Sequence, residues 1–327
     1  MSTEFDKDLR ELEDKIEELK KFAVDKKMDM SAEIQKLEAK AEQQRKKVYG
    51  SLSAWNVVQL MRHPERPRCL DYCEKIFTDW MEVHGDHTMA DDKSLITGFG
   101  RIDGQNVAVM GNQKGRDTKE NIYRNFGMAQ PEGYRKALRF MKLAERFQVP
   151  IISFIDIMGA YPGIEGEERS VAEAIARNLA EMSLFKVPII VTVIGEGGSG
   201  GALGIGIGDR VLMLQNGFYS VISPEGCAAI LWRDRNRAEE AAEALKGTAG
   251  DLLKLKVIDD IVPEPLGGAH RDPALAASNL KAALLKHLAD LKKIDTTTLV
   301  EQRYAKYRAM GVWAEVPSAS AGQAQLA

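Results

Sequence analysis

A dense run of glycines constrains this chain more than any other feature of its sequence. Eight of the fourteen residues from 195 to 208, GEGGSGGALGIGIG, are glycine, and the run directly follows the apolar segment 187–194. Such an apolar segment is typical of a buried strand, and glycine lets the backbone turn tightly and approach another group closely. The pattern therefore predicts a strand that ends where bare backbone N–H groups meet an oxygen-rich group.

Composition limits the class of protein that carries this run. The chain has 327 residues with a net charge of −3, so it is long enough to bury a site. The small negative charge argues against a general binder of nucleic acids or of anionic membranes. No apolar stretch reaches the roughly 18 residues of a membrane-spanning helix, and the charged start resembles no targeting peptide. We therefore expect a cytoplasmic protein with its three cysteines reduced.

The chain divides into four predicted regions. Residues 1–50 have helical apolar spacing with a polar break, which predicts an antiparallel hairpin used for packing or subunit contact. Residues 51–100 predict an irregular helical connection and residues 101–293 the core. Residues 294–327 predict a C-terminal helix and a disordered tail.

Within the core, predicted strands alternate with predicted helices. We expect strands at 107–110, 150–156, 188–194, 211–214 and 218–222, and helices at 134–147, 165–186, 225–232, 238–246 and 275–291; the C-terminal helix is expected at 299–310. Repeated strand–turn–helix units favour a mostly parallel sheet with right-handed crossovers. The predicted fold class is therefore α/β.

The glycine run also matches, fully or in part, three known motifs, which belong to dinucleotide binding, phosphate binding and serine hydrolysis. It contains G-x-G-x-x-G, but the next strand ends without the acidic residue that binds a dinucleotide ribose. A Walker phosphate loop needs lysine where Gly201 stands. The run contains G-x-S-x-G around Ser199, and Asp259, Asp260 and His270 follow in the order of a hydrolase triad. A serine hydrolase is therefore an open alternative.

A fourth interpretation uses the backbone instead of a side chain. If a helix begins near Gly200 and Gly201, their N–H groups lie at its positive end and can stabilise an oxyanion. Every fourth residue from Gly200 to Gly208 is glycine, and these residues would share one face of that helix. The strand that ends at Asp156 also runs into a glycine turn, at 159–163. The sequence thus predicts a cleft between two such turns.

A metal site is not expected from the sequence. His84 and His87 stand close together in a polar loop, but no third ligand follows at the spacing of a metal site. Neighbouring acidic residues read as a solvated loop.

Several longer motifs are similar to one enzyme family. The glycine run, SVISPEGC at 220–227 and PEPLGGAHR at 263–271 closely resemble the carboxyltransferase alpha subunits of bacterial acetyl-CoA carboxylase. So do NQKGR at 112–116, NFGM at 125–128 and PEGYRK at 131–136, and the likeness covers roughly residues 8–311. The resemblance implies a crotonase-type fold of the ClpP/crotonase superfamily, a superhelix of ββα units.

The resemblance also implies a reaction and its partners. The family transfers a carboxyl group from carboxybiotin to acetyl-CoA and forms malonyl-CoA, the first committed step of fatty acid synthesis. Biotin is presented by the biotin carboxyl carrier protein, and a beta subunit of the same fold, which carries the zinc, completes an α₂β₂ assembly. Biotin carboxylase joins the larger complex. By resemblance, this chain binds no cofactor covalently and holds no metal.

By resemblance, residues of the glycine run and of the glycine turn at 159–163 are expected to face carboxybiotin. Negative charge develops on the ureido oxygen of biotin, and the N–H groups of Gly200 and Gly201 are expected to stabilise it. The ureido nitrogen itself can take the methyl proton of acetyl-CoA, so no side-chain base is required. The remaining expected contacts with carboxybiotin are Gly159, Ala160, Gly163, Gly198, Ser199 and Ser223.

Basic residues form another set of candidates. Lys114, Arg116, Lys119 and Arg124 are placed to contact CoA phosphates or acidic groups of the carrier protein. A solvated polar loop is the alternative interpretation of these four residues.

One turn departs from the family pattern. Relatives usually read DTPGAYPG where this chain has DIMGAYPG at 156–163. Met158 frees a φ angle that proline would fix and restores an N–H group, and Ile157 removes a hydroxyl from beside the expected biotin path. A non-catalytic scaffold or regulatory subunit is therefore a further alternative.

Overall fold

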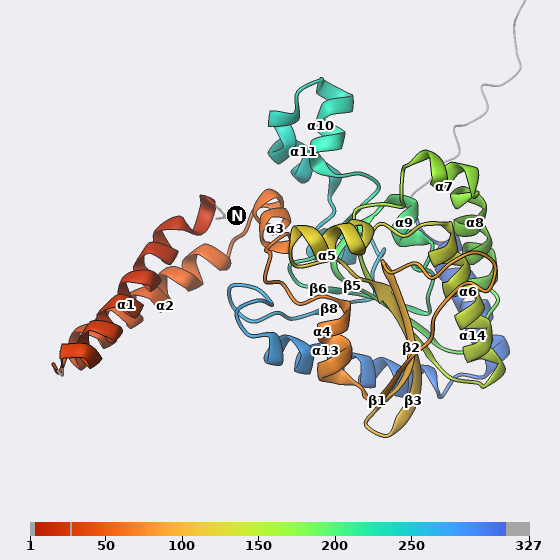
Figure 1. Cartoon of the computed structure of the whole chain (residues 1–327), viewed down its shortest axis with the longest axis horizontal. Coiled ribbons are helices and arrows are strands. Elements are labelled where there is room, and N and C mark those ends of the chain that lie inside the picture. Colours follow the sequence, from red (N-terminus) through yellow and green to blue (C-terminus); the bar gives the residue numbers. More distant parts are fainter. Residues whose placement is uncertain (1–3, 27, 312–327) are drawn as a thin grey trace, which may run out of the picture.

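An eight-stranded sheet lies between two layers of helices in the computed structural model of the chain (Figure 1). The structure describes residues 4–26 and 28–311, and the sheet is that of these residues. The strands are β1 (Thr78–Glu82), β2 (Leu95–Ile102), β3 (Gln105–Asn112), β4 (Ile151–Ile157), β5 (Ile189–Gly198), β6 (Arg210–Leu214), β7 (Phe218–Ser220) and β8 (Asp260–Val262). Their order is β1-β2-β3-β4-β5-β6-β8, and β7 pairs with the last residues of β5.

Strand pairing in the sheet changes from antiparallel to parallel at β3. Strands β1, β2 and β3 are antiparallel neighbours, whereas β3, β4, β5, β6 and β8 pair in parallel. Every residue of β4 and β5 is buried, because both faces of a parallel sheet are covered by helices. The predicted α/β class with mostly parallel pairing is confirmed.

Helices on the two faces bury alternate residues of the strands. Helices α6 (Pro131–Arg146) and α8 (Val171–Met182) cover the face that contains Ile151 and Ile155. Helices α4 (Cys69–Ile76) and α13 (Pro273–Leu291) cover the face that contains Ile152 and Phe154. This alternation follows from the two-residue period of a strand.

Two helical pairs project from this body (Figure 1). Helices α1 (Lys7–Lys26) and α2 (Ser31–Tyr49) form the predicted hairpin, and α10 (Pro224–Trp232) and α11 (Ala238–Leu245) form a second projection. The other helices are α3 (Ala54–Met61), α5 (Thr118–Tyr123), α7 (Ile164–Glu168), α9 (Ser199–Leu203), α12 (Ala249–Lys254) and α14 (Thr296–Arg308), with 3-10 turns at Glu4–Asp6, Asn125–Gly127 and Arg235–Arg237. No described helix combines the length and apolar character needed to cross a membrane.

Three sequence expectations were wrong in detail. Residues 51–100 contain strands β1 and β2 as well as two short helices, not only an irregular helical connection. The helix expected at 165–186 is divided into α7 and α8 by Ser170, whose φ of 63° lies in the left-handed region and interrupts the helical hydrogen bonds. Strand β5 extends to Gly198, beyond its predicted end at 194. The predicted disordered tail at 318–327 lies outside the described residues.

Candidate functional site

The two glycine turns meet at the carboxyl ends of the parallel neighbours β4 and β5. A Cβ atom added to Gly198 would lie 1.9 Å from the carbonyl oxygen of Met158. One added to Gly201 would lie 2.4 Å from the backbone nitrogen of Ala160. Real Cβ atoms do not approach backbone this closely, so only glycine allows the turn after β4 to lie on α9. The sequence analysis predicted a cleft between the two turns, but the structure packs them in direct contact at these two glycines.

The sequence analysis expected Gly200, Gly204 and Gly208 to share one face of a helix, and this expectation was wrong. Helix α9 has only five residues and ends at Leu203. Gly204 packs against the ring of Tyr134, and Gly208 lies against Val191 of β5. Gly200 has open space instead, because the nearest atom to an added Cβ would be the Cδ1 atom of Ile175 at 3.7 Å.

Side chains of three elements fix the backbone that follows the turn. The Tyr134 hydroxyl donates to the carbonyl of Gly201 (3.2 Å), and the Asn178 amide donates to the carbonyl of Gly204 (2.8 Å). The hydroxyl of Ser153 on β4 donates to the carbonyl of Ile205 (2.7 Å). These bonds fix the carbonyls of α9 and of the two residues that follow it against α6, α8 and β4.

A charged cluster lies beside the turns. Lys114, which follows β3, donates to Asp156 (2.7 Å) and to Glu196 (3.3 Å), and the backbone N–H of Glu196 also donates to Asp156 (3.1 Å). Burial opposes the charge of Lys114, but the two carboxylates outweigh burial and raise its pKa. Arg62, directly after α3, continues the cluster to Glu196 (3.4 Å) and to Glu225 of α10 (2.5 Å).

A cavity of about 230 Å³ opens next to this cluster. It is lined by Met61, Arg62, His63, Arg66, Arg68, Lys114, Gly115, Asn121, Phe126, Asp156, Met158 and Glu196. Its walls come from α3, the segment before α4, the ends of β4 and β5, and the loop around α5. The sequence analysis missed Arg62, Arg66 and Arg68, because they lie in a segment that carried no recognised motif.

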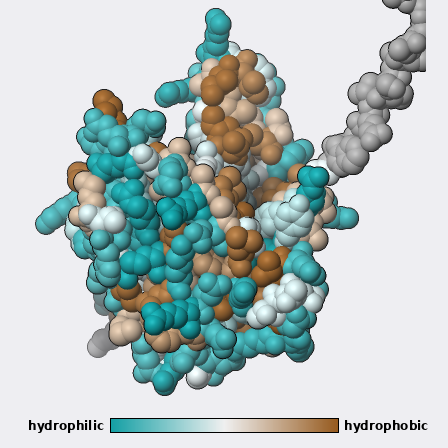
Figure 2. All heavy atoms as spheres, turned by 90° about the vertical axis from the view of Figure 1, so that its right-hand side faces the viewer, coloured by the Kyte–Doolittle hydropathy of each residue, from teal (hydrophilic) through white to brown (hydrophobic). Residues whose placement is uncertain are grey.

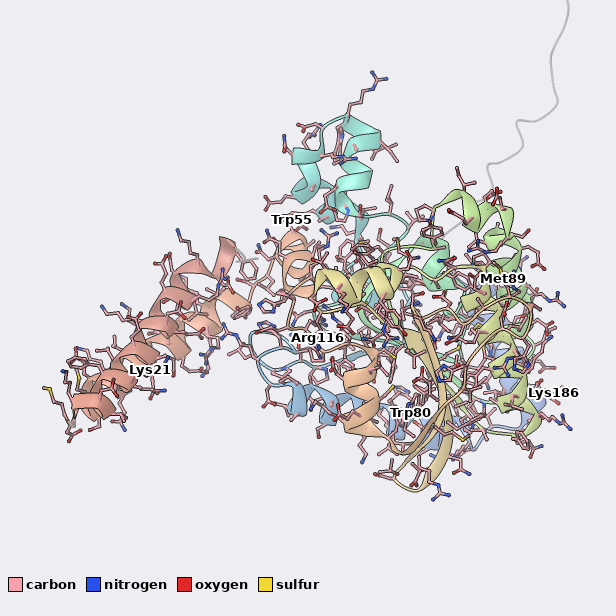
Figure 3. The ribbon with its side chains drawn as sticks, viewed as in Figure 1. Lys21, Trp55, Trp80, Met89, Arg116 and Lys186 are labelled. Carbon is pink, nitrogen blue, oxygen red and sulfur yellow. The ribbon has the colours of Figure 1, made fainter. Side chains whose placement is uncertain are left out.

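The four basic candidates have different surroundings. Lys114 lies within the charged cluster, and Arg116, labelled below α5 in Figure 3, pairs with Asp71. Arg124 donates to the backbone carbonyl of Lys93 (2.8 Å), and the side chain of Lys119 is exposed. Lys119 is therefore the candidate that is most available to an external anion.

Of the expected carboxybiotin contacts, Gly159, Ala160 and Gly163 lie in the turn after β4, and Gly198 and Ser199 lie at the end of β5 and the beginning of α9. Ser199 is exposed and has a φ of 50°. Ser223 stands apart, since its hydroxyl accepts a hydrogen bond from the N–H of Gly226 (3.1 Å) and caps α10. That capping bond explains a serine at this position without a ligand.

Ile157, which stands where relatives usually have threonine, does not lie beside a ligand path as the sequence analysis expected. The Ile157 side chain is fully buried in the core between the sheet and α6, so a threonine hydroxyl there would lie in the core and not beside a ligand path. Met158 is 48% exposed and lines the cavity.

The residues of a hydrolase triad are not assembled. Ser199 has the positive φ of a strand-to-helix elbow, but Asp259 and Asp260 pair with side chains of α14 and α13. His270 stacks on His63 with ring centroids 3.8 Å apart. Among the described residues no carboxylate forms a hydrogen bond with His270, so the order of these residues in the sequence does not correspond to a triad in space.

Metal-binding groups are also dispersed in the described part of the chain. No three His, Cys, Asp or Glu side chains there are arranged to hold an ion. His84 contacts Asp91 (3.1 Å) in the loop that was considered for a metal.

Comparison with known proteins matches almost the whole chain to one family. The family model described as "Acetyl co-enzyme A carboxylase carboxyltransferase-like" matches residues 2–311. The acetyl-coenzyme A carboxylase carboxyl transferase subunit alpha of Syntrophotalea carbinolica is 59% identical over 308 residues, which cover 94% of this chain and 97% of that protein. The subunit of the same name from Geobacter metallireducens is 57% identical over 95% of this chain and 98% of its own length.

Solved structures share the fold at low sequence identity. A transcarboxylase 12S structure superposes with a TM-score of 0.52 and 23% identity, over 65% of this chain and 41% of that one. The beta subunit of a geranyl-CoA carboxylase from P. aeruginosa has a TM-score of 0.54 and 16% identity, over 78% and 46% of the two chains. The fold is therefore the crotonase-like fold of carboxyltransferases.

Proposed function

This chain belongs to the acetyl-coenzyme A carboxylase carboxyltransferase family, as an alpha subunit, and from that premise we propose how its site works. The reaction moves a carboxyl group from carboxybiotin to acetyl-CoA and yields malonyl-CoA. The contact between the turn after β4 and the beginning of α9 carries the proposal, because it holds two glycine turns closely together at the carboxyl ends of two central strands.

We assign the chain the carboxybiotin side of the reaction. Biotin would supply the carboxyl group on a ureido nitrogen. When that C–N bond breaks, the electron pair would remain on the ureido group, whose nitrogen would take a methyl proton from acetyl-CoA, and the methyl carbon would form the new C–C bond to the carboxyl carbon. The N–H groups of Gly200 and Gly201 face the developing charge on the ureido oxygen. Preorganised donors of this kind each commonly lower a barrier by about 3 kcal/mol.

Two features support the fit of this group to the turns. The backbone nitrogen of Ala160 lies against Gly201, so the two turns bring their polar backbone groups together. The neighbouring cavity of about 230 Å³ has room for a small polar ring system and carries four arginine and lysine side chains. Gly159, Gly163, Gly198 and Ser199 shape the approach without supplying a side-chain base or nucleophile.

The site is completed by partners. A beta subunit of the same fold supplies the acetyl-CoA side and a zinc site, and the two subunits assemble as α₂β₂ with the biotin carboxyl carrier protein and biotin carboxylase. Support comes from the surface, because large apolar side chains are exposed on α9, on α10 and in the segment before α10, namely Leu203, Ile230, Leu231 and Val221. Figure 2 shows apolar residues gathered over the α10–α11 projection. The exposed Lys119 is available for CoA phosphates or acidic carrier groups, whereas Arg116 already pairs with Asp71.

Reconstitution tests the proposal. The purified chain alone is expected to form no malonyl-CoA from acetyl-CoA and a carboxylated carrier, and addition of the zinc-bearing beta subunit is expected to restore the reaction. A complex that binds both partners yet makes no malonyl-CoA would rule out the proposed function. Full activity of Ser199→Ala in the complex, together with no labelling by a fluorophosphonate, would exclude the hydrolase alternative.

The scaffold alternative has its own test at the departing turn. Because Met158 lies beside the cavity, Met158→Pro in the complex should change the rate only modestly if the chain is already catalytic. A gain from no activity to measurable activity, in Met158→Pro or in the double variant with Ile157→Thr, would instead indicate a non-catalytic subunit.

A further inference from the structure

The cavity beside the turns has one unpaired positive charge on its wall. Four arginine and lysine side chains line it, and three of them already have carboxylate partners. Lys114 pairs with Asp156 and Glu196, Arg62 with Glu225 and Glu196, and Arg66 with Glu264 through two bonds of 2.6 and 2.9 Å. Among the described residues, Arg68 forms no ion pair with a carboxylate.

The guanidinium of Arg68 is held in place while part of it stays unsatisfied. Its Nη2 atom donates to the carbonyl of Pro64 (3.3 Å), whereas its Nη1 atom is buried and has no hydrogen-bond partner. A buried donor without a partner is unfavourable, and for a charged group the penalty is larger. Because Nη1 is closed to water in this conformation, an acceptor from outside the chain would satisfy it once the guanidinium turns into the cavity that Arg68 lines.

We propose that Arg68 is the carboxylate-binding residue of this cavity and holds the carboxylate of the N-carboxylated ureido group. This assignment rests on the proposed function, since it places the carboxyl donor in the cavity beside the turn that contains Met158. A planar guanidinium matches a planar carboxylate, which accepts charge-assisted hydrogen bonds.

The walls favour a monoanion over a phosphate. Asp156 and Glu196 also line the cavity, and their negative charge opposes a dianion more strongly than a single carboxylate. The volume of about 230 Å³ suits a small carboxylated ring. The exposed Lys119 remains the better candidate for a CoA phosphate.

Arg68 can be changed without removing the beginning of α4. Its backbone N–H, not its side chain, donates to Asp71 (2.8 Å), so Arg68→Gln keeps this bond. Arg146→Gln is a matched control, because Arg146 is an exposed residue in the last turn of α6 and does not line the cavity.

Binding of bicarbonate to the full chain tests the assignment, because bicarbonate carries the same planar carboxylate on a heteroatom. Line broadening of ¹³C-bicarbonate should reveal binding to the wild type and to Arg146→Gln, with an affinity about tenfold or more weaker in Arg68→Gln and partly restored in Arg68→Lys. Absence of binding, equal binding in Arg68→Gln, or tighter binding of inorganic phosphate in ³¹P spectra would overturn the assignment.

The reconstituted complex gives an independent readout. Arg68→Gln should raise the KM for the carboxylated carrier and leave the KM for acetyl-CoA unchanged; the reverse pattern would assign Arg68 to CoA and overturn the proposal. If the wild-type complex forms no malonyl-CoA, the proposed function fails, yet the bicarbonate measurement on the chain alone still decides whether Arg68 binds a carboxylate.

Discussion

At the scale of single residues, Gly200 and Gly201 differ sharply although they are neighbours. Gly201→Ala would place a methyl group against the backbone of Gly159 and Ala160, whereas the same change at Gly200 meets only the Cδ1 atom of Ile175. We expect Gly201→Ala to lower the free energy of unfolding by about 1–3 kcal/mol through overpacking, and Gly200→Ala to change it by less than about 0.5 kcal/mol.

Activity of the same two variants separates backbone chemistry from packing. Alanine keeps the N–H group, so Gly200→Ala should retain most of the kcat of the complex, while Gly201→Ala should lose at least about tenfold because the turn after β4 must move. Urea unfolding and initial rates measure both quantities. Similar losses in the two variants would contradict the packing difference described for α9.

His270 is expected to make the free energy of unfolding depend on pH. Burial, with smaller effects from His63 and Arg271, lowers the pKa of His270 to about 4 from an ordinary value of 6.5. The folded state therefore prefers the neutral ring, so this contribution to stability is present above pH 6.5 and is lost as the pH falls towards 4. We expect His270→Gln to flatten the pH dependence of the free energy of unfolding between pH 7 and 4, whereas substitution of the exposed His87 should leave it unchanged.

At the scale of elements, the buried side chain of Arg303 attaches α14 to the body, together with contacts of Lys306 and Tyr307. Arg303 is 1% exposed and forms two 2.8 Å bonds with Asp209. It also donates to the backbone carbonyls of Met182, Phe185 and Val187. Asp209 in turn accepts from the N–H of Ile189, the first residue of β5. Helix α14 thus joins the end of α8, β5 and β6.

Removal of this attachment should be costly. Arg303→Met leaves Asp209 buried without its partner, so we expect a loss of roughly 3–5 kcal/mol in the free energy of unfolding. Arg303→Lys should recover little, because an ammonium group cannot reach the carboxylate and three carbonyls at once. Arg308→Met, in the last turn of the same helix, serves as a control. Unfolding in urea with an unchanged m-value would show that only stability had changed.

Elements with a local signal were predictable, and those defined by distant contacts were not. The strand and turn at 187–201 could be read from apolar and glycine patterns, and the α/β class followed from their repetition. The charged cluster could not be predicted, because Lys114 and Glu196 are 82 residues apart and meet only when β3 and β5 lie in one sheet. The break at Ser170 carried no glycine or proline that would have indicated it.

For the whole molecule, the distribution of exposed apolar side chains predicts where the proposed beta subunit binds. Leu231 on α10 and Leu184 after α8 are each 65% exposed, but only Leu231 lies on the α10–α11 projection, which the Arg62–Glu225 ion pair connects to the charged cluster. Trp55 of α3 lies directly beneath this projection in Figure 3, and α3 contacts α11. The α10–α11 projection is therefore connected to the charged cluster by an ion pair and to α3 by packing.

This arrangement predicts that Leu231→Glu weakens assembly without unfolding the chain. A charge placed in a buried apolar interface loses its hydration, so the affinity for the beta subunit should fall by at least about a hundredfold, while the urea midpoint of the isolated chain stays within error of the wild type. Leu184→Glu, with equal exposure, should leave both quantities unchanged. Analytical ultracentrifugation of mixtures with the beta subunit measures the affinity. Equal weakening by the two substitutions would place the interface elsewhere, and with it the direction from which acetyl-CoA reaches the two turns.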